Sequence, residues 1–240
     1  MTERFTLRLI TSCVDWRLCH DPLIFLLEVS LMLLTAQHRL QDYRPAQLDG
    51  HHPRAAVLMP IINHEIPTLL LTRRNARLSS HAGQVAFPGG KLDPEDESLE
   101  ACALRESFEE IGLPPGQVRL LGRLSERFSA NGMIVTPFVG LIEPEVRFTP
   151  NPDEIDDIFE VELARLMTDP RQHTDVIRDD ETCWYVPSYT ILEHTLWGLS
   201  AMMVVELLSV AFHVDIGLDR YPETSTLRHL PPRPSRRRPS

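Results

Sequence analysis

One segment of the chain, residues 88–115, constrains the fold most strongly, because it predicts an amphipathic helix with a charged face. We expect the helix to begin near Asp96 or Ser98, which are both favoured N-cap residues. Gly112 suits the left-handed position after a helix, and the two prolines that follow prevent its continuation. The segment therefore predicts a short helix that packs one face on another layer.

The acidic side chains of this helix share one face. At about 100° per residue, Glu109 and Glu110 fall within about 60° of Glu106. The apolar side chains are expected on the opposite face, and they are Ala101, Leu104, Phe108 and Ile111. Three carboxylates within one turn repel one another, and a divalent cation would remove that penalty. Carboxylate oxygens suit Mg²⁺ or Mn²⁺, whereas a solvated acidic face is the alternative interpretation.

Short apolar runs with strand character lie on both sides of this helix. The runs are residues 55–62, 68–74, 84–87, 118–124, 135–142, 158–161 and 182–187. Residues 162–167 predict a helical turn, and residues 188–210 form a long apolar segment with helical periodicity. Strands interleaved with two substantial helices predict an α/β sandwich.

The chemistry-bearing residues around the predicted helix follow the spacing of a known motif. They resemble the Nudix box, G-x5-E-x7-R-E-U-x-E-E-x-G-U, through Gly90, Glu97, Arg105, Glu106, Glu109, Glu110 and Gly112. Six residues instead of five separate Gly90 from Glu97, and Ser107 stands where an aliphatic residue is usual. This resemblance implies a Nudix-type α/β/α sandwich with a mixed sheet.

The residues before the box resemble one branch of that family, the coenzyme A pyrophosphatases. The branch signature LLTxR…HxGEVAFPGG is matched by Leu70-Leu71-Thr72-x-Arg74 and by residues 81–90, HAGQVAFPGG. Asn75 departs from the small residue that usually follows the arginine, and Gln84 replaces the usual glutamate. The likeness extends over about residues 54–210 of the chain.

The resemblance also implies roles for individual residues. Glu106, Glu109 and Glu110 would bind the metal ion, and Arg105 and Glu97 would form a supporting salt bridge. In the acidic stretch 151–161, Glu154 would be an additional ligand or the base that activates water, although a plain solvated loop is the alternative. Substrate phosphates would be bound by Arg74 and Arg77, and the backbone would approach the diphosphate at Gly89 and Gly90.

The expected reaction is hydrolysis of the diphosphate of coenzyme A or acyl-coenzyme A, giving 3′,5′-ADP and (acyl-)4′-phosphopantetheine. The physics suits the residues, because phosphoryl transfer needs charge neutralisation and alignment more than covalent help. Two alternatives stay open. One is the same chemistry on NADH, ADP-ribose or a dinucleotide polyphosphate, and the other is a non-catalytic nucleotide sensor.

Composition limits the partners of the chain. The formal net charge is −10, so an acidic surface would repel nucleic acid. None of the four cysteines forms a CxxC pair, which favours reduced thiols in the cytoplasm. The apolar run 23–34 is too short to span a bilayer, so no stable membrane insertion is expected. A homo-oligomer remains open.

Three regions are expected along the chain. Residues 1–50 would be an N-terminal extension and linker, with Met32 as a candidate true start that makes residues 1–31 non-native. Residues 51–216 would form the catalytic domain. Residues 217–240 would be a disordered tail, because they are rich in proline and arginine.

Overall fold

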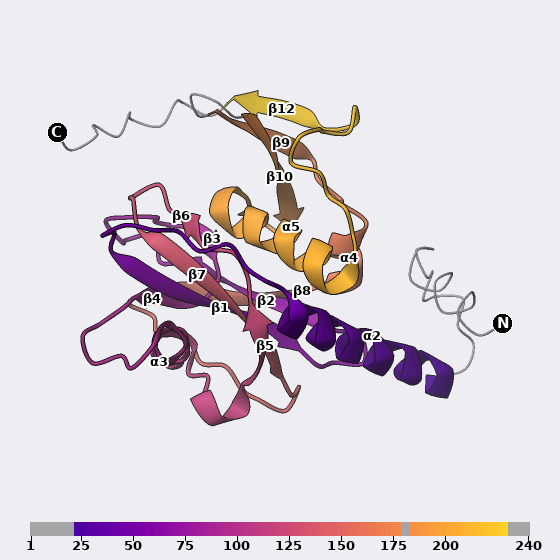
Figure 1. Cartoon of the computed structure of the whole chain (residues 1–240), viewed down its shortest axis with the longest axis horizontal. Helices are drawn as coiled ribbons and strands as arrows, with labels where there is room; N and C mark the ends of the chain where they lie inside the picture. Colours follow the sequence, from indigo (N-terminus) through magenta and orange to yellow (C-terminus); the bar gives the residue numbers. More distant parts are fainter. Residues whose placement is uncertain (1–21, 179–182, 230–240) are drawn as a thin grey trace.

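A computed structural model describes residues 22–178 and 183–229 of the chain (Figure 1). Its helices are α2 (Pro22–Asp42), α3 (Leu99–Ile111), the 3-10 helix η2 (Pro115–Gln117), α4 (Leu163–Met167) and α5 (Gly198–Phe212). Its strands are β1 (Arg54–Ile62), β2 (Thr68–Arg74), β3 (Val85–Ala86), β4 (Gly89–Lys91), β5 (Arg119–Arg123), β6 (Arg127–Phe128), β7 (Ile134–Ile142), β8 (Ile155–Glu162), β9 (His173–Arg178), β10 (Cys183–Ile191), β11 (His194–Leu196) and β12 (Thr226–His229).

Eight of these strands form a mixed sheet. Its main path runs β3-β2-β1-β7-β5, while β4 pairs with β1, β6 with β7 and β8 with β2. The central pair β1–β7 is parallel and the neighbouring pairs are antiparallel. The smaller four-stranded sheet has the order β11-β10-β9-β12. The predicted mixed sheet is therefore confirmed.

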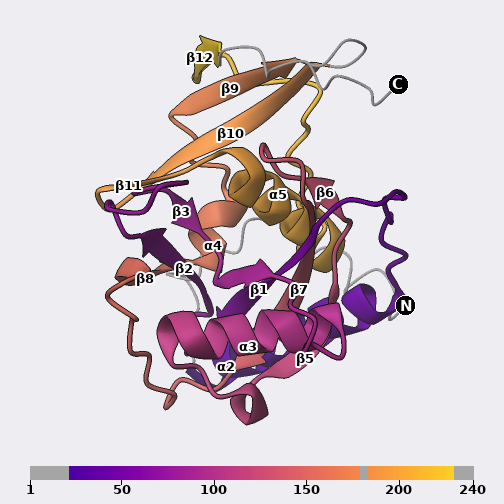
Figure 2. The same cartoon turned by 90° about the vertical axis from the view of Figure 1, so that its left-hand side faces the viewer.

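Helices cover both faces of the larger sheet (Figure 2). On one face, Leu58 of β1 belongs to a buried cluster with Cys102 and Ala103 of α3. On the other face, Met59 belongs to a cluster with residues of α2 and α5. Consecutive residues of β1 thus point into opposite layers, as strand geometry requires. The expected α/β/α sandwich is confirmed, and β1 is buried on both sides.

The segment 188–210 differs from its predicted single helix. Its first residues continue β10 as far as Ile191, then β11 follows, and α5 begins only at Gly198. Gly198 has φ +60, a left-handed conformation that separates β11 from the helix. An apolar run buried on several sides has no clean periodicity, so the sequence pattern did not distinguish strand from helix here.

Helix α2 is longer than the apolar run 23–34. Its second half belongs to the core, because Leu33, Ala36 and Leu40 are buried beside α5 and β5. Its first half exposes leucines, and Leu23–Asp42 is long and apolar enough, by length and composition alone, to cross a membrane. Residues 1–21 of the expected extension lie outside the described residues.

The C-terminal boundary also differs from the expected one. A disordered tail was predicted from residue 217, whereas the chain forms β12 at Thr226–His229, parallel to β9. Arg228 donates to both carboxylate oxygens of Asp175, at 2.8 and 3.1 Å, and Asp175 is fully buried. Composition predicted a tail, but this ion pair holds the segment on the sheet. Residues 230–240 lie outside the described part of the chain.

Candidate active site

Helix α3 begins and ends where the sequence predicts. The Ser98 hydroxyl accepts a hydrogen bond from the backbone N–H of Ala101 at 3.0 Å, which is an N-cap contact. Gly112 adopts φ +68, and its N–H donates to the carbonyl of Phe108. Both caps fix the length of the helix and thereby the position of its glutamates.

The buried face of α3 is the predicted one only in part. Ile111 is fully buried, but Phe108 is 54% exposed, and the helix also packs on the sheet through a strip of small residues. The strip consists of Cys102, Ala103 and Ser107, and the Ser107 hydroxyl is satisfied by the carbonyl of Ala103 at 2.7 Å. Small side chains let the backbone approach the sheet closely. As a result, Glu106 and Glu110 lie at the edge of the packed face and not opposite to it.

Glu110 is the most buried of the three glutamates, with 2% exposure. One carboxylate oxygen accepts from the Gly89 N–H at 3.0 Å, and the other from Nη1 of Arg74 at 3.1 Å. Burial raises the pKa of Glu110 to about 7, even though these two donors oppose the shift. The charges of Glu106 and Glu154 raise it further. The two donors therefore do not fully offset the cost of burying ionised Glu110, and an additional positive charge would stabilise its ionised form.

Glu106 lies directly against the turn at Gly90. A Cβ on Gly90 would overlap the carboxylate of Glu106, so any larger residue at this position would displace that carboxylate. Burial also raises the pKa of Glu106, and the nearby charges of Glu109 and Glu154 act in the same direction. Arg105 opposes them.

Arg105 joins the loop before the helix to the acidic face. Its guanidinium contacts Asp96 twice at 2.9 Å, Glu106 at 3.1 Å, Glu109 at 3.0 Å and the Lys91 carbonyl at 3.1 Å. The predicted partner Glu97 is exposed, so the expected Arg105–Glu97 bridge is replaced by Arg105–Asp96. Sequence reasoning missed Asp96, although this residue stands at the five-residue spacing after Gly90.

The structure also brings Glu154 to the site. Its charge raises the pKa of both Glu106 and Glu110, so its carboxyl group lies near theirs. The loop that carries it is attached to the end of β2 by Asn75, which is 3% exposed. The Asn75 amide donates to the Pro152 carbonyl and its backbone N–H donates to the Glu154 carbonyl, both at 2.7 Å. Sequence reasoning noticed Asn75 only as a departure from the signature.

The predicted substrate-binding arginines have different environments. Arg74 is bound to Glu110, so it supports the carboxylate directly. Arg77 is exposed on the loop after β2, and its backbone N–H donates to the side-chain oxygen of Asn75 at 2.9 Å. Arg73 points to Asp156 at 3.7 Å. Of these arginines, Arg77 has the guanidinium most available to a ligand.

The donor set fits Mg²⁺ or Mn²⁺. Glu106, Glu109, Glu110 and Glu154 supply only carboxylate oxygens, which are the ligands that these hard cations prefer. Burial raises the pKa of two of them, so a cation would offset a real electrostatic cost. Gly90 has no side chain, and the Glu106 carboxylate occupies the position that a Cβ there would take.

The chain is similar in sequence to known proteins. Residues 51–180 match a family model described as the NUDIX domain. A protein named uncharacterized Nudix hydrolase NudL from Photorhabdus laumondii is 46% identical over 164 residues, which cover 68% of this chain and 87% of that protein. A protein of the same name from Pectobacterium atrosepticum is 43% identical over 177 residues, covering 70% and 89%.

Two solved structures are also similar. A Caenorhabditis elegans Ap4A hydrolase binary complex aligns with a TM-score of 0.40 and 18% identity, over 48% of this chain and 84% of that one. The NUDIX domain of Shewanella oneidensis NrtR complexed with ADP ribose aligns with a TM-score of 0.41 and 20% identity, over 55% and 85%.

Proposed function

The chain belongs to the Nudix hydrolase family as a pyrophosphatase, and from this premise we propose that its substrate is coenzyme A or an acyl-coenzyme A. The products would be 3′,5′-ADP and (acyl-)4′-phosphopantetheine. One observation carries the proposal: the segment that resembles the coenzyme A branch forms a wall of the acidic site. Arg74 and Gly89, both from that segment, are the two donors to Glu110.

The residues of the site have different proposed roles in the reaction. Glu106, Glu109 and Glu110 would hold Mg²⁺ or Mn²⁺, which would neutralise the diphosphate and lower the pKa of a water molecule. Glu154 accepts the proton of the attacking water. The water oxygen bonds to one phosphorus, the bridging P–O bond breaks, and the leaving phosphate retains the bridging oxygen. Gly89 and Gly90 let the backbone approach the diphosphate because they lack side chains.

Arg77 is the residue that we assign to the 3′-phosphate of the substrate. Its exposed guanidinium offers several donors in a fork that matches phosphate geometry. Dephospho-coenzyme A lacks that phosphate and is therefore the direct probe. Replacing Arg77 with alanine should raise KM for coenzyme A and leave KM for dephospho-coenzyme A unchanged.

The proposed partners are small molecules. We place the protein in the cytoplasm, where the described cysteines Cys102 and Cys183 would stay free thiols. The acidic net charge disfavours binding to nucleic acid.

Product identification in a mixed substrate panel tests the proposal. Coenzyme A, dephospho-coenzyme A, NADH, ADP-ribose and a dinucleotide polyphosphate are incubated with Mg²⁺, and the products are identified by mass spectrometry. We expect 3′,5′-ADP to form fastest from the coenzyme A substrates. Faster turnover of NADH or ADP-ribose would overturn the substrate assignment while leaving the reaction class intact.

Substitution of the glutamates tests the site itself. Glu106→Gln and Glu110→Gln should each lower kcat by about 10²-fold or more, because a charge partner of the reacting group is lost. Glu100→Gln is the matched control, since Glu100 is exposed at the start of the same helix. Unchanged kcat in both site variants, with the fold intact by circular dichroism, would refute the assignment.

A further inference from the structure

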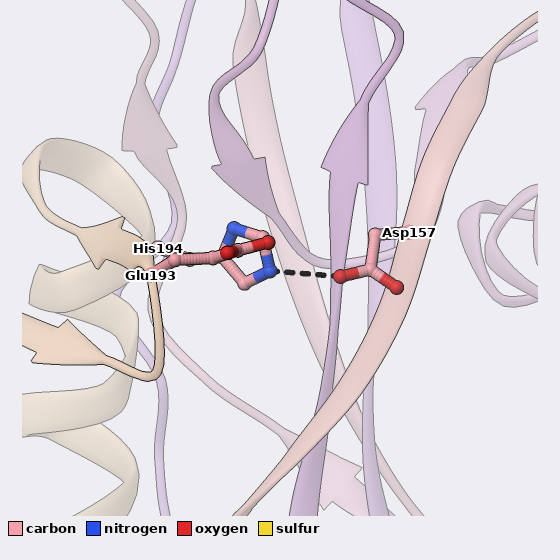
Figure 3. A group of neighbouring side chains, drawn as sticks. All are labelled: Asp157, Glu193 and His194. Atoms are coloured by element: carbon pink, nitrogen blue, oxygen red, sulfur yellow. Dashed lines mark hydrogen bonds and ion pairs between the residues drawn. The ribbon is translucent and has the colours of Figure 1, made fainter.

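We propose that Asp157, Glu193 and His194 form a second divalent-metal site, which favours a borderline ion such as Zn²⁺ and is separate from the glutamate site. Asp157 lies on β8, Glu193 lies in the turn after β10, and His194 begins β11. One ligand atom from each residue lies within 4.8 Å of the others (Figure 3). The proposal goes beyond the pyrophosphatase reaction and does not depend on its substrate.

Asp157 and His194 are hydrogen-bonded, with Nε2 of His194 2.8 Å from Oδ2 of Asp157, and an ion would replace this hydrogen bond. With zinc–ligand bonds of about 2.0–2.2 Å, two ligands on one tetrahedral zinc lie about 3.4 Å apart. A small separation of the pair would therefore admit an ion, and the exposed Glu193 side chain can rotate towards it.

The imidazole ring of His194 is buried and packed, so its orientation is fixed as that of a metal ligand usually is. The side chain of His194 is only 3% exposed, and its ring lies against the ring of Phe159 with the centroids 4.4 Å apart. Such an apolar shell limits solvent access and fixes the orientation of the ligand. The neighbouring Arg73 directs its guanidinium to Asp156, so the partner that the structure gives to the Asp157 carboxylate is His194.

The donor set separates this site from the glutamate site. One imidazole nitrogen and two carboxylate oxygens favour zinc, cobalt or nickel, whereas Mg²⁺ prefers oxygen ligands alone. An ion here would join β11 of the smaller sheet to β8 of the larger sheet. Because it binds only the folded arrangement, it would stabilise the protein by mass action.

Cobalt spectroscopy in excess Mg²⁺ tests the proposal, because Mg²⁺ saturates the all-oxygen site and Co²⁺ reports ligands by visible absorption. We expect one Co²⁺ per chain to bind with a visible band, and we expect Zn²⁺ to displace it. Glu193→Gln and Asp157→Asn should each weaken binding at least tenfold. Glu193 is exposed in a turn, so its substitution leaves the fold intact.

Two controls make the outcome specific. His64→Asn removes another histidine–carboxylate pair, because Nε2 of His64 lies 3.0 Å from Glu160 of β8 and the described part of the chain offers no third ligand there. This variant should bind Co²⁺ like the unmodified chain. Glu106→Gln should also keep the band, so failure of the pyrophosphatase assignment would not affect this result.

Thermal unfolding supplies a second readout that does not involve activity. Saturating Zn²⁺ should raise the Tm of the unmodified chain by about 5 °C in excess Mg²⁺ and leave the Tm of Asp157→Asn unchanged. Absence of a Co²⁺ band in the unmodified chain would overturn the proposal. An identical band in both Glu193→Gln and Asp157→Asn would also overturn it.

Discussion

Among single residues, Arg105 of α3 forms its strongest ion pair with Asp96 in the preceding loop. Its bond to Asp96 lowers the pKa of that carboxyl to about 2 from 3.8, while burial opposes the shift. The side chain of Asp96 is 4% exposed, but the Arg105 side chain is 28% exposed, so solvent screening reduces the strength of the pair. The ion pair therefore ties the loop to the helix at a moderate gain in stability.

Substitution of Asp96 should show a pH signature. The folded-state pKa is below the unfolded value, so the stabilisation is present above about pH 4 and is lost as the pH falls towards 2. Asp96→Asn should lower the free energy of unfolding by about 1–2 kcal/mol at pH 7 and by less at pH 3. Urea unfolding at the two pH values measures this. Glu97→Gln is the control, and an equal loss in that variant would contradict the assigned pair.

Asn75 is expected to position Glu154. Asn75→Ala leaves the Pro152 carbonyl without its donor, and the loop that carries Glu154 loses a buried attachment. We expect kcat to fall about tenfold with little change in KM, because small displacements of a reacting group are costly. Steady-state kinetics measure both constants. In a Glu154→Gln background the Asn75→Ala change should have no further effect on kcat, and an additive effect would refute the connection.

These residues show what the sequence could and could not predict about the site. Glu106, Glu109 and Glu110 follow from helical periodicity, since their relative directions are a local property. Asp96 and Asn75 depend on contacts with residues distant along the chain, which local spacing does not encode. The helix brings Glu109 to Arg105, whereas the conformation of the preceding loop decides that Asp96 and not Glu97 is the loop acid that pairs with it.

Among secondary-structure elements, α3 and β4 are the pair that defines the site. The sequence predicted the caps of α3 correctly, and on the predicted apolar face Ile111 is buried whereas Phe108 is exposed. Hydrophobicity alone favoured Phe108, but close packing selected the small side chains Ala103 and Ser107. Strand β4 is three residues long and contains two glycines, so the sequence had no apolar pattern from which to predict it.

Gly90→Ala tests the contact between these two elements. The added Cβ would lie 2.3–2.4 Å from the Glu106 carboxylate, so that carboxylate must move. We expect kcat to fall at least tenfold and the Mg²⁺ concentration for half-maximal activity to rise, with little change in Tm. A Mg²⁺ titration of activity measures both effects. Gly116→Ala is the control because nothing lies within 4 Å of its Cβ, and equal kinetics in the two variants would contradict the contact.

At the scale of the whole molecule, two segments that were expected from the sequence to lie outside the folded domain pack on the two sheets. The second half of α2 packs into the core cluster, and strand β12 pairs with β9 of the smaller sheet (Figure 1). Apolar strand runs were predictable because burial leaves a local pattern in each of them. The docking of β12 was not, since it depends on residues distant along the chain, through the parallel pairing with β9 and the Arg228–Asp175 ion pair.

Loss of the ion pair between Arg228 of β12 and Asp175 of β9 should destabilise the smaller sheet. Asp175 is fully buried and receives two hydrogen bonds from Arg228, which also donates to Ser188 at 2.8 Å. Arg228→Ala leaves that carboxylate buried without a cation, and we expect a loss of about 2 kcal/mol because Arg228 is itself partly exposed. Differential scanning calorimetry should then show a Tm lower by about 4–8 °C.

Two truncated chains give the sharper comparison. A chain that ends at residue 229 retains β12 and serves as the reference. A chain that ends at residue 216 loses β12 and the Arg228–Asp175 pair, so its Tm should fall at least as far as that of Arg228→Ala. Equal Tm values for the two truncated chains would mean that β12 adds nothing to the fold. The glutamate site is built on α3 and the larger sheet, so its Mg²⁺ dependence should be the same in both truncated chains.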